Sequence, residues 1–184
     1  MDAGLIARRY ATVLHDYAKD RGKLEEVYAD AVAICQALAS QPQAEEYLGS
    51  PLHKPSEKRA LVQEVFGSHV TEETLQFMTF LVEKDRIGMA GAILRVFGTL
   101  YKEENDICTA TITTAKELTD EQRSRIVEQI ASKLRASGKR VTTVDAEFKV
   151  KPAIIGGMIL TIDGRQLDNS VESKLRKLEK TLTV

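Results

Sequence analysis

The stretch Ile154-Ile155-Gly156-Gly157-Met158-Ile159-Leu160-Thr161-Ile162 decides how the last third of this sequence folds. It is followed by Asp163-Gly164 and then by Leu167-Asp168-Asn169-Ser170. An apolar, β-branched run before an Asp-Gly pair is typical of a strand that enters a tight hairpin. Ser170 stands where a helix cap is expected, ahead of a charged segment with helical periodicity. We therefore expect a strand, a hairpin, a cap and a helix in close succession.

Gly156 and Gly157 interrupt the expected strand. Glycine inside a strand loses packing and usually marks a bulge or a close approach of two backbone segments. Backbone amides at such a pair can also bind an anion, but a strand context without a following helix start disfavours that alternative. A bulge or a tight packing contact is the better interpretation.

Working outward, residues 106–184 have the pattern of a small α/β domain. Alternating β-branched residues at 107–113 indicate one strand, and 141–150 indicate another. Thr119 and Gln122 form a capping box before a helix that ends near Gly138. With the glycine-interrupted strand and a last helix, this domain has a short sheet and two helices.

Residues 1–105 have a different character, because apolar residues recur there at three- and four-residue spacing with no strand pattern. The expected helices cover 5–17, 24–38, 44–48, a segment opening at Pro55, a segment opening at Thr71 and about 86–101. The sequence thus predicts an α+β fold, with an amino-terminal six-helix bundle at 1–105 and the small domain at 106–184.

Composition limits the classes of partner. The 184 residues are 43% hydrophobic, and 26 basic residues balance 27 acidic ones. This balance disfavours nucleic acid and anionic lipid as partners. Cys35 and Cys108 form no paired motif and are interpreted as buried thiols. We expect no direct membrane insertion, because no run approaches the roughly 18 apolar residues of a spanning helix.

Motifs for catalysis or cofactor binding are missing from the sequence. It contains no Gly-rich phosphate loop, no G-x-S-x-G and no H-E-x-x-H. His15, His53 and His69 are scattered without evident ligand partners. We expect no catalytic residue, no metal, no cofactor and no small-molecule substrate.

The helix expected after Thr71 carries an unusual surface. Gln76, Thr79 and Glu83 share one helical face, and Phe80 lies among them. Phe80 either packs against a neighbouring helix or lines a groove for a partner helix. The first helix leaves the same two interpretations open, because its Tyr10 is either an aromatic anchor or part of the core.

Four segments together resemble one known family: Ala7-Arg8-Arg9-Tyr10-Ala11-Thr12-Val13-Leu14, Phe80-Leu81-Val82-Glu83-Lys84-Asp85-Arg86-Ile87, Ile154-Ile155-Gly156-Gly157 and Leu167-Asp168-Asn169-Ser170-Val171. In this order and spacing they resemble the delta subunit of bacterial F-type ATP synthases. The related mitochondrial subunit is the oligomycin-sensitivity-conferring protein. The resemblance covers essentially the whole chain.

The resemblance implies a non-catalytic stator subunit of a proton-translocating ATP synthase. Such a subunit links the alpha/beta catalytic head to the b subunits of the peripheral stalk, so that rotor torque is converted to ATP synthesis. It is held at the cytoplasmic face of the bacterial plasma membrane through the complex. In the family, the helical domain binds amino-terminal helices of alpha subunits in a groove between its first and fifth helices, and the other domain meets the b subunits.

The resemblance also assigns residues to these roles. The expected alpha-subunit contacts are Tyr10, Val13, Leu14, Thr79, Phe80 and Glu83, and helical spacing alone adds Gln76. Gly156, Gly157 and Asp168 are expected to shape the stalk-binding domain. The alternative is a soluble helical adaptor of another multiprotein complex, and an enzyme of unrecognised type comes third.

Overall fold

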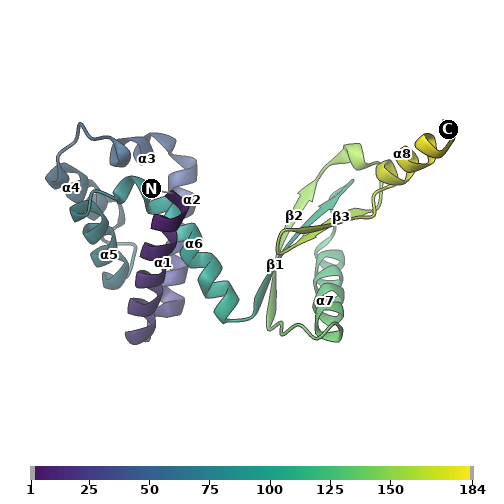
Figure 1. The fold of residues 1–184 in the computed structure, drawn as a ribbon, viewed down its shortest axis with the longest axis horizontal. Helices are drawn as coiled ribbons and strands as arrows, with labels where there is room; N and C mark the ends of the chain where they lie inside the picture. Colours follow the sequence, from purple (N-terminus) through teal and green to yellow (C-terminus); the bar gives the residue numbers. More distant parts are fainter. Residues whose placement is uncertain (1–2, 183–184) are drawn as a thin grey trace. The chain divides into compact units, whose positions relative to one another are not determined.

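The computed structural model describes residues 3–182 and divides the chain into two compact units, residues 1–102 and 103–184 (Figure 1). The first unit is helical, and the second contains a mixed four-stranded sheet. The predicted α+β class, with a helical amino-terminal part and a sheet-containing carboxy-terminal part, is confirmed.

Short connections join the helices of the first unit. These elements are α1 (Ala3–Asp20), α2 (Leu24–Ser40), α3 (Pro42–Gly49), α4 (Pro55–Phe66), α5 (Glu72–Glu83), the 3-10 turn η1 (Ile87–Met89) and α6 (Ala90–Glu104). The segment expected to open at Thr71 is α5, and Thr71 caps it, because its hydroxyl accepts a hydrogen bond from the Thr74 N–H at 3.3 Å.

The start of the last helix of this unit differs from the prediction. We expected it to begin near Arg86, but η1 comes first and α6 begins at Ala90. Close backbone packing accounts for the turn, since a Cβ atom on Gly88 would lie 2.6 Å from the Cα atom of Gly49.

One hydrophobic core holds the helical unit together. α1 contributes a buried stripe of small and large residues at helical spacing, which is Ala7, Ala11, Leu14 and Ala18. Phe97 and Ile93 of α6, both 0% exposed, belong to the same core. Small residues on α1 permit this close packing of helices.

The second unit begins with a β1–α7–β2 crossover and ends with a hairpin and a helix. Its elements are β1 (Ile107–Thr114), α7 (Asp120–Ala136), β2 (Thr143–Val150), the 3-10 turn η2 (Pro152–Ile154), β3 (Met158–Ile162), β4 (Arg165–Asp168) and α8 (Val171–Leu182). The strand order is β2-β1-β3-β4, with β1 and β2 parallel and the other pairs antiparallel. The core of this unit includes Ile112 of β1 and Ile130 of α7.

The region that opened the sequence analysis is partly as predicted. The Asp163-Gly164 hairpin is confirmed, with positive φ at both residues (44° and 80°), as a two-residue type I′ turn requires. The placement of the glycine pair within a strand is wrong, because η2 precedes it and β3 begins only at Met158. The φ values of Ile155 and Gly157, 66° and 73°, are incompatible with an extended strand.

Candidate partner-binding surfaces

Side chains of α1 contact side chains of α5, and the two helices run antiparallel to each other. The rings of Tyr10 and Phe80 have centroids 6.1 Å apart. Nearer the carboxyl end of α1, the Tyr17 hydroxyl donates a 2.7 Å hydrogen bond to Oε1 of Gln76. These two pairs hold α1 and α5 together through long side chains.

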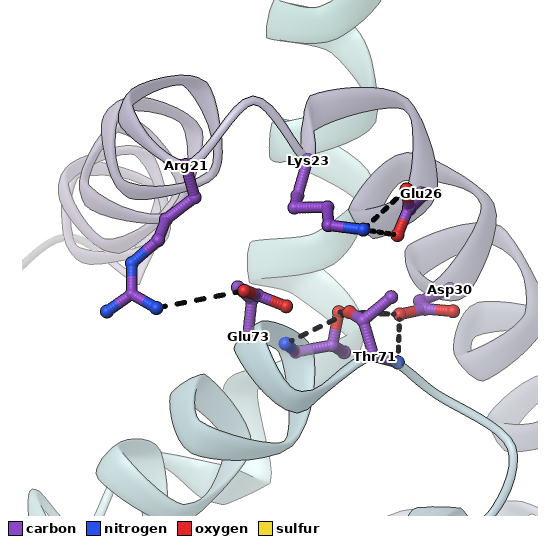
Figure 2. Close-up of polar contacts among 7 residues, drawn as sticks. Arg21, Lys23, Glu26, Asp30, Thr71 and Glu73 are labelled. Atoms are coloured by element: carbon purple, nitrogen blue, oxygen red, sulfur yellow. Dashed lines mark hydrogen bonds and ion pairs between the residues drawn. The ribbon is translucent and has the colours of Figure 1, made fainter.

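A polar clasp fixes the start of α5 against α2 (Figure 2). Oδ2 of Asp30 accepts hydrogen bonds from the Thr71 N–H at 2.8 Å and the Thr71 hydroxyl at 2.7 Å. It also accepts one from the Thr74 hydroxyl at 2.8 Å. Bonds to a carboxylate are among the stronger ones in proteins, so this clasp sets the position of α5.

A second contact at the same end joins α5 to the end of α1. Arg21 lies 3.8 Å from a carboxylate oxygen of Glu73, as Figure 2 shows. Exposed ion pairs of this kind contribute little to stability. Its value is geometric, because it keeps the first turn of α5 beside α1.

The outward face of α5 borders a cavity of about 360 Å³ on the side of α4. The residues that line it are Gln63, Glu72, Leu75, Gln76, Thr79, Phe80 and Glu83. From α4, Arg59 donates a 2.9 Å hydrogen bond to Glu83. The four site residues predicted on the fifth helix, Gln76, Thr79, Phe80 and Glu83, are therefore brought together on one surface.

Phe80 packs against neighbouring aromatic rings and also lines the cavity. Its ring packs on Phe77 at 6.4 Å as well as on Tyr10, so it belongs to the border of the core. It also lines the cavity, and the Lys84 ammonium lies 5.5 Å from its ring centre. A partly covered aromatic side chain in this position can anchor an apolar side chain of a partner.

The predicted residues on α1 occupy three different environments. Tyr10 is half-buried beside Phe80, and Val13 is 50% exposed. Leu14 is 0% exposed and lies in the hydrophobic core. Tyr10 and Val13 thus present surface, whereas Leu14 supports α1 from inside.

Sequence reasoning missed the remaining residues around the cavity. Glu72 and Leu75 stand one turn before Gln76 and Thr79, so the same helical spacing would have found them. Gln63 and Arg59 come from α4. No pattern within one helix predicts which neighbouring helix supplies the opposite wall.

In the second unit, the glycine pair packs against the start of α8. A Cβ atom on Gly157 would lie 2.4 Å from the carbonyl oxygen of Asn169, so only glycine fits this backbone contact. The carbonyl of Gly156 accepts a 2.9 Å hydrogen bond from the Val171 N–H. The two glycines therefore hold the residues that lead into α8.

Asp168 organises the first turn of α8. The Ser173 hydroxyl donates to its carboxylate at 2.5 Å, and the Ser170 N–H donates at 2.9 Å. These bonds to Ser173 and Ser170 lower the pKa of Asp168 to about 2, because they favour the charged carboxylate. Ser170 in turn caps the helix by accepting from the Ser173 N–H at 3.2 Å.

Beyond this turn, the second unit exposes several large apolar side chains. They are Ile155 at 63%, Leu167 at 67%, Leu175 at 51% and Leu178 at 59% exposure. Leu175 and Leu178 lie three residues apart on α8 and therefore share one helical face. Exposed apolar residues gathered on an amphipathic helix mark a surface for a protein partner.

Other kinds of site were sought over residues 3–182. No group of three or more His, Cys, Asp or Glu residues that could hold a metal ion occurs within this range. Within the same range, no helix is both long enough and apolar enough to cross a membrane.

Comparisons with known proteins agree with one another. The family described as ATP synthase delta (OSCP) subunit matches residues 6–182. ATP synthase subunit delta of Lactobacillus acidophilus is 34% identical over 173 residues, covering 94% of this chain and 92% of that protein. The same subunit of Prochlorococcus marinus (strain AS9601) is 30% identical over 178 residues, covering 97% and 96%.

The fold has a relative among solved structures as well. A chain in the cryo-EM structure of the Toxoplasma gondii mitochondrial ATP synthase hexamer is similar with a TM-score of 0.72 over 97% of each chain, at 22% identity. This likeness concerns the fold alone. The sequence matches over nearly the whole length show that the chain belongs to the ATP synthase delta (OSCP) subunit family.

Proposed function

We propose that this chain is the non-catalytic stator subunit of a proton-translocating F-type ATP synthase. It links the catalytic head to the peripheral stalk, so that the head stays fixed while the central rotor turns. Its membership of the delta (OSCP) subunit family over residues 6–182 is the observation that carries this proposal. With this family assignment, the alternative of an adaptor from another complex loses its support.

The bacterial relatives support a finer localisation. The subunit is held at the cytoplasmic face of the plasma membrane through the other subunits of the complex. Its own contribution is mechanical, because it holds subunits together and performs no chemical step.

Residues 1–105 form a six-helix bundle that binds the amino-terminal helix of an alpha subunit. The contacts between α1 and α5 support this role, together with the cavity beside Phe80. The contact residues are Tyr10, Val13, Gln76, Thr79, Phe80 and Glu83, with Leu14 supporting them from the core.

A stator contact must resist sustained torque without dissociating. An aromatic centre with a polar rim suits this demand better than exposed ion pairs, which salt screens. Tyr10 and Phe80 supply the aromatic centre, and Gln76 and Glu83 belong to the rim.

Residues 106–184 bind the b subunits of the stalk. The support is the exposed apolar group of Ile155, Leu167, Leu175 and Leu178. Gly156, Gly157 and Asp168 have a structural role in this domain, because they hold the base of α8 in place.

Calorimetric titration with a peptide of the alpha subunit's amino-terminal segment tests the head contact. If Tyr10 and Phe80 are central anchors, Tyr10→Ala or Phe80→Ala costs about 2 kcal/mol or more of binding free energy. Val32→Ala serves as the matched control, because Val32 is an apolar residue 39% exposed on α2. Circular dichroism establishes that each variant is folded. Unchanged affinity in a folded variant removes that residue from the site.

A further inference from the structure

We propose that the Asp163-Gly164 turn is a site of spontaneous aspartate isomerisation, and that contacts from Lys139 and Cys108 to the Asp163 carboxylate hold this reaction back in the folded second unit. The inference goes beyond the proposed function and does not depend on it. Three features of the molecule support it: the sequence of the turn, its backbone angles and the two donors that bind its carboxylate.

An Asp-Gly pair is prone to this reaction because glycine has no Cβ atom to shield its backbone nitrogen. The nitrogen of Gly164 attacks Cγ of Asp163 and forms a C–N bond, while the amide proton and a carboxyl OH leave as water. Water then opens the resulting five-membered succinimide ring. Opening at Cγ restores aspartate, whereas opening at the main-chain carbonyl carbon routes the backbone through Cβ and Cγ and gives isoaspartate. The water lost in the first step is regained in the second, so no enzyme or oxidant is required.

The turn between β3 and β4 contains the only Asp-Gly pair in the sequence, which has no Asn-Gly pair. The side chain of Asp163 is 43% exposed, so water can reach it. The sequence and the exposure of this turn therefore meet the requirements of the reaction.

The backbone of the folded turn opposes ring closure. The positive φ values of Asp163 and Gly164, 44° and 80°, belong to a type I′ turn, in which ψ of the first central residue is about +30°. The succinimide ring includes the Cα–C bond of Asp163, and its closure rotates ψ far from that value. The Asp163 N–H donates a 3.2 Å hydrogen bond to the Thr109 carbonyl, which holds the turn against β1. The hairpin must therefore open before the ring can close.

Two donors also hold the side chain of Asp163. Lys139, in the loop after α7, forms an ion pair with Oδ2. The Cys108 thiol of β1 lies 3.8 Å from Oδ1 and 3.7 Å from Oδ2. Burial raises the pKa of Cys108, so this thiol keeps its proton and remains a donor. Rotation of the carboxyl group toward the Gly164 nitrogen would break both contacts.

The charge on Asp163 slows the reaction as well. A carboxylate is a poorer electrophile than a carboxylic acid, because its negative charge repels the attacking nitrogen. Burial alone would raise the pKa of Asp163, but the hydrogen bond and the positive charge of Lys139 outweigh burial and place the pKa below its ordinary value. Loss of Lys139 therefore frees the side chain and increases the fraction of the reactive acid.

Isomerisation would change the hairpin itself. Isoaspartate adds one carbon atom to the backbone of a two-residue turn, and register in a hairpin is set by the turn. The pairing of β3 with β4 places Asp168 opposite Ile159, at the base of α8. The contacts that Lys139 and Cys108 make thus protect the position of α8.

Peptide mapping measures isoaspartate at this turn. Trypsin cleaves after Lys149 and Arg165 but not before Pro152, and the peptide 150–165 contains Asp163 as its only aspartate and no asparagine. The full chain and a synthetic peptide of residues 150–165 are incubated at neutral pH, and the aspartate and isoaspartate forms are separated by chromatography. We expect isomerisation to be at least about tenfold slower in the folded chain, because the reaction waits for local opening. Equal rates overturn the protection, and absence of isoaspartate from both samples overturns the site.

A substitution tests the role of Lys139 separately. We expect Lys139→Gln to isomerise about threefold faster than the unsubstituted chain, because an exposed ion pair holds its partners only weakly. Arg125→Gln is the matched control, since it removes an exposed ion pair with Glu121 on α7 and leaves the peptide 150–165 unchanged. Circular dichroism establishes that both variants are folded. A rate in Lys139→Gln equal to that of the control overturns the protective role of Lys139.

Discussion

At the scale of single residues, Gly157 allows the sharpest test of the packing argument. A Cβ atom there meets both an unfavourable φ of 73° and the Asn169 carbonyl oxygen at 2.4 Å. We expect Gly157→Ala to lower the free energy of unfolding of the second unit by about 3 kcal/mol, of which the φ alone accounts for about 1–2 kcal/mol. Urea denaturation measures this change.

Gly164→Ala separates the two causes. Gly164 has a φ of 80°, but nothing lies within 4 Å of an added Cβ atom. We expect this variant to lose only the conformational part, about 1–2 kcal/mol. Equal losses in the two variants would show that the clash with Asn169 relaxes at little cost.

Asp168 makes the start of α8 sensitive to acid. Because hydrogen bonds from Ser173 and Ser170 lower its pKa to about 2, below an ordinary value near 4, the folded state favours the carboxylate. The stabilisation is therefore complete above about pH 4 and is lost as the pH falls through about 2. The Ser173 amide signal in an NMR titration should shift over this range. In Asp168→Asn the carboxylate is absent, and a shift that persisted there would assign the titration to another group.

The same residues show the limits of prediction from sequence. The glycine pair stood out in the sequence, but its placement in a strand was wrong because the positive φ at Gly157 depends on Asn169, which is distant along the chain. Helical spacing correctly puts Leu14 on the apolar face of α1. Spacing does not reveal that other helices cover it completely.

At the scale of elements, signals confined to one helix were predicted well. The Thr119–Gln122 capping box is formed as expected, with the Thr119 hydroxyl accepting from the Gln122 N–H at 3.3 Å. Thr71 likewise caps α5. The start of α6 was missed because it depends on the contact between Gly49 and Gly88, which joins two elements.

α8 is the element whose role is easiest to isolate. Leu175 and Leu178 are more than half exposed, so replacing both with Glu should leave the fold intact. We expect Leu175→Glu/Leu178→Glu to weaken binding to the soluble part of the b subunits at least about tenfold, because buried apolar surface drives such contacts. Surface plasmon resonance measures the affinity. Lys174→Glu, at an exposed position of the same helix, controls for charge, and equal losses there would point to a purely electrostatic effect.

At the scale of the whole molecule, the sequence did not predict which strands pair with each other. Each strand segment has a local pattern, but the order β2-β1-β3-β4 depends on β3 pairing with β1, a strand more than forty residues earlier. No local signal specifies that choice. The class of each half was predictable because periodicity changes from helical spacing to alternation.

The two units have separate hydrophobic cores that share no residue. Binding of the alpha-subunit peptide should therefore involve the helical unit alone. We expect a fragment of residues 1–105, which retains all of α6, to bind within about twofold of the full chain, because every proposed contact and its supporting core lie within it. Calorimetry compares the two affinities. Chemical-shift changes in the full chain should be confined to the first unit, and changes that spread into the sheet would show that the units are coupled and that the head contact extends beyond the helical unit.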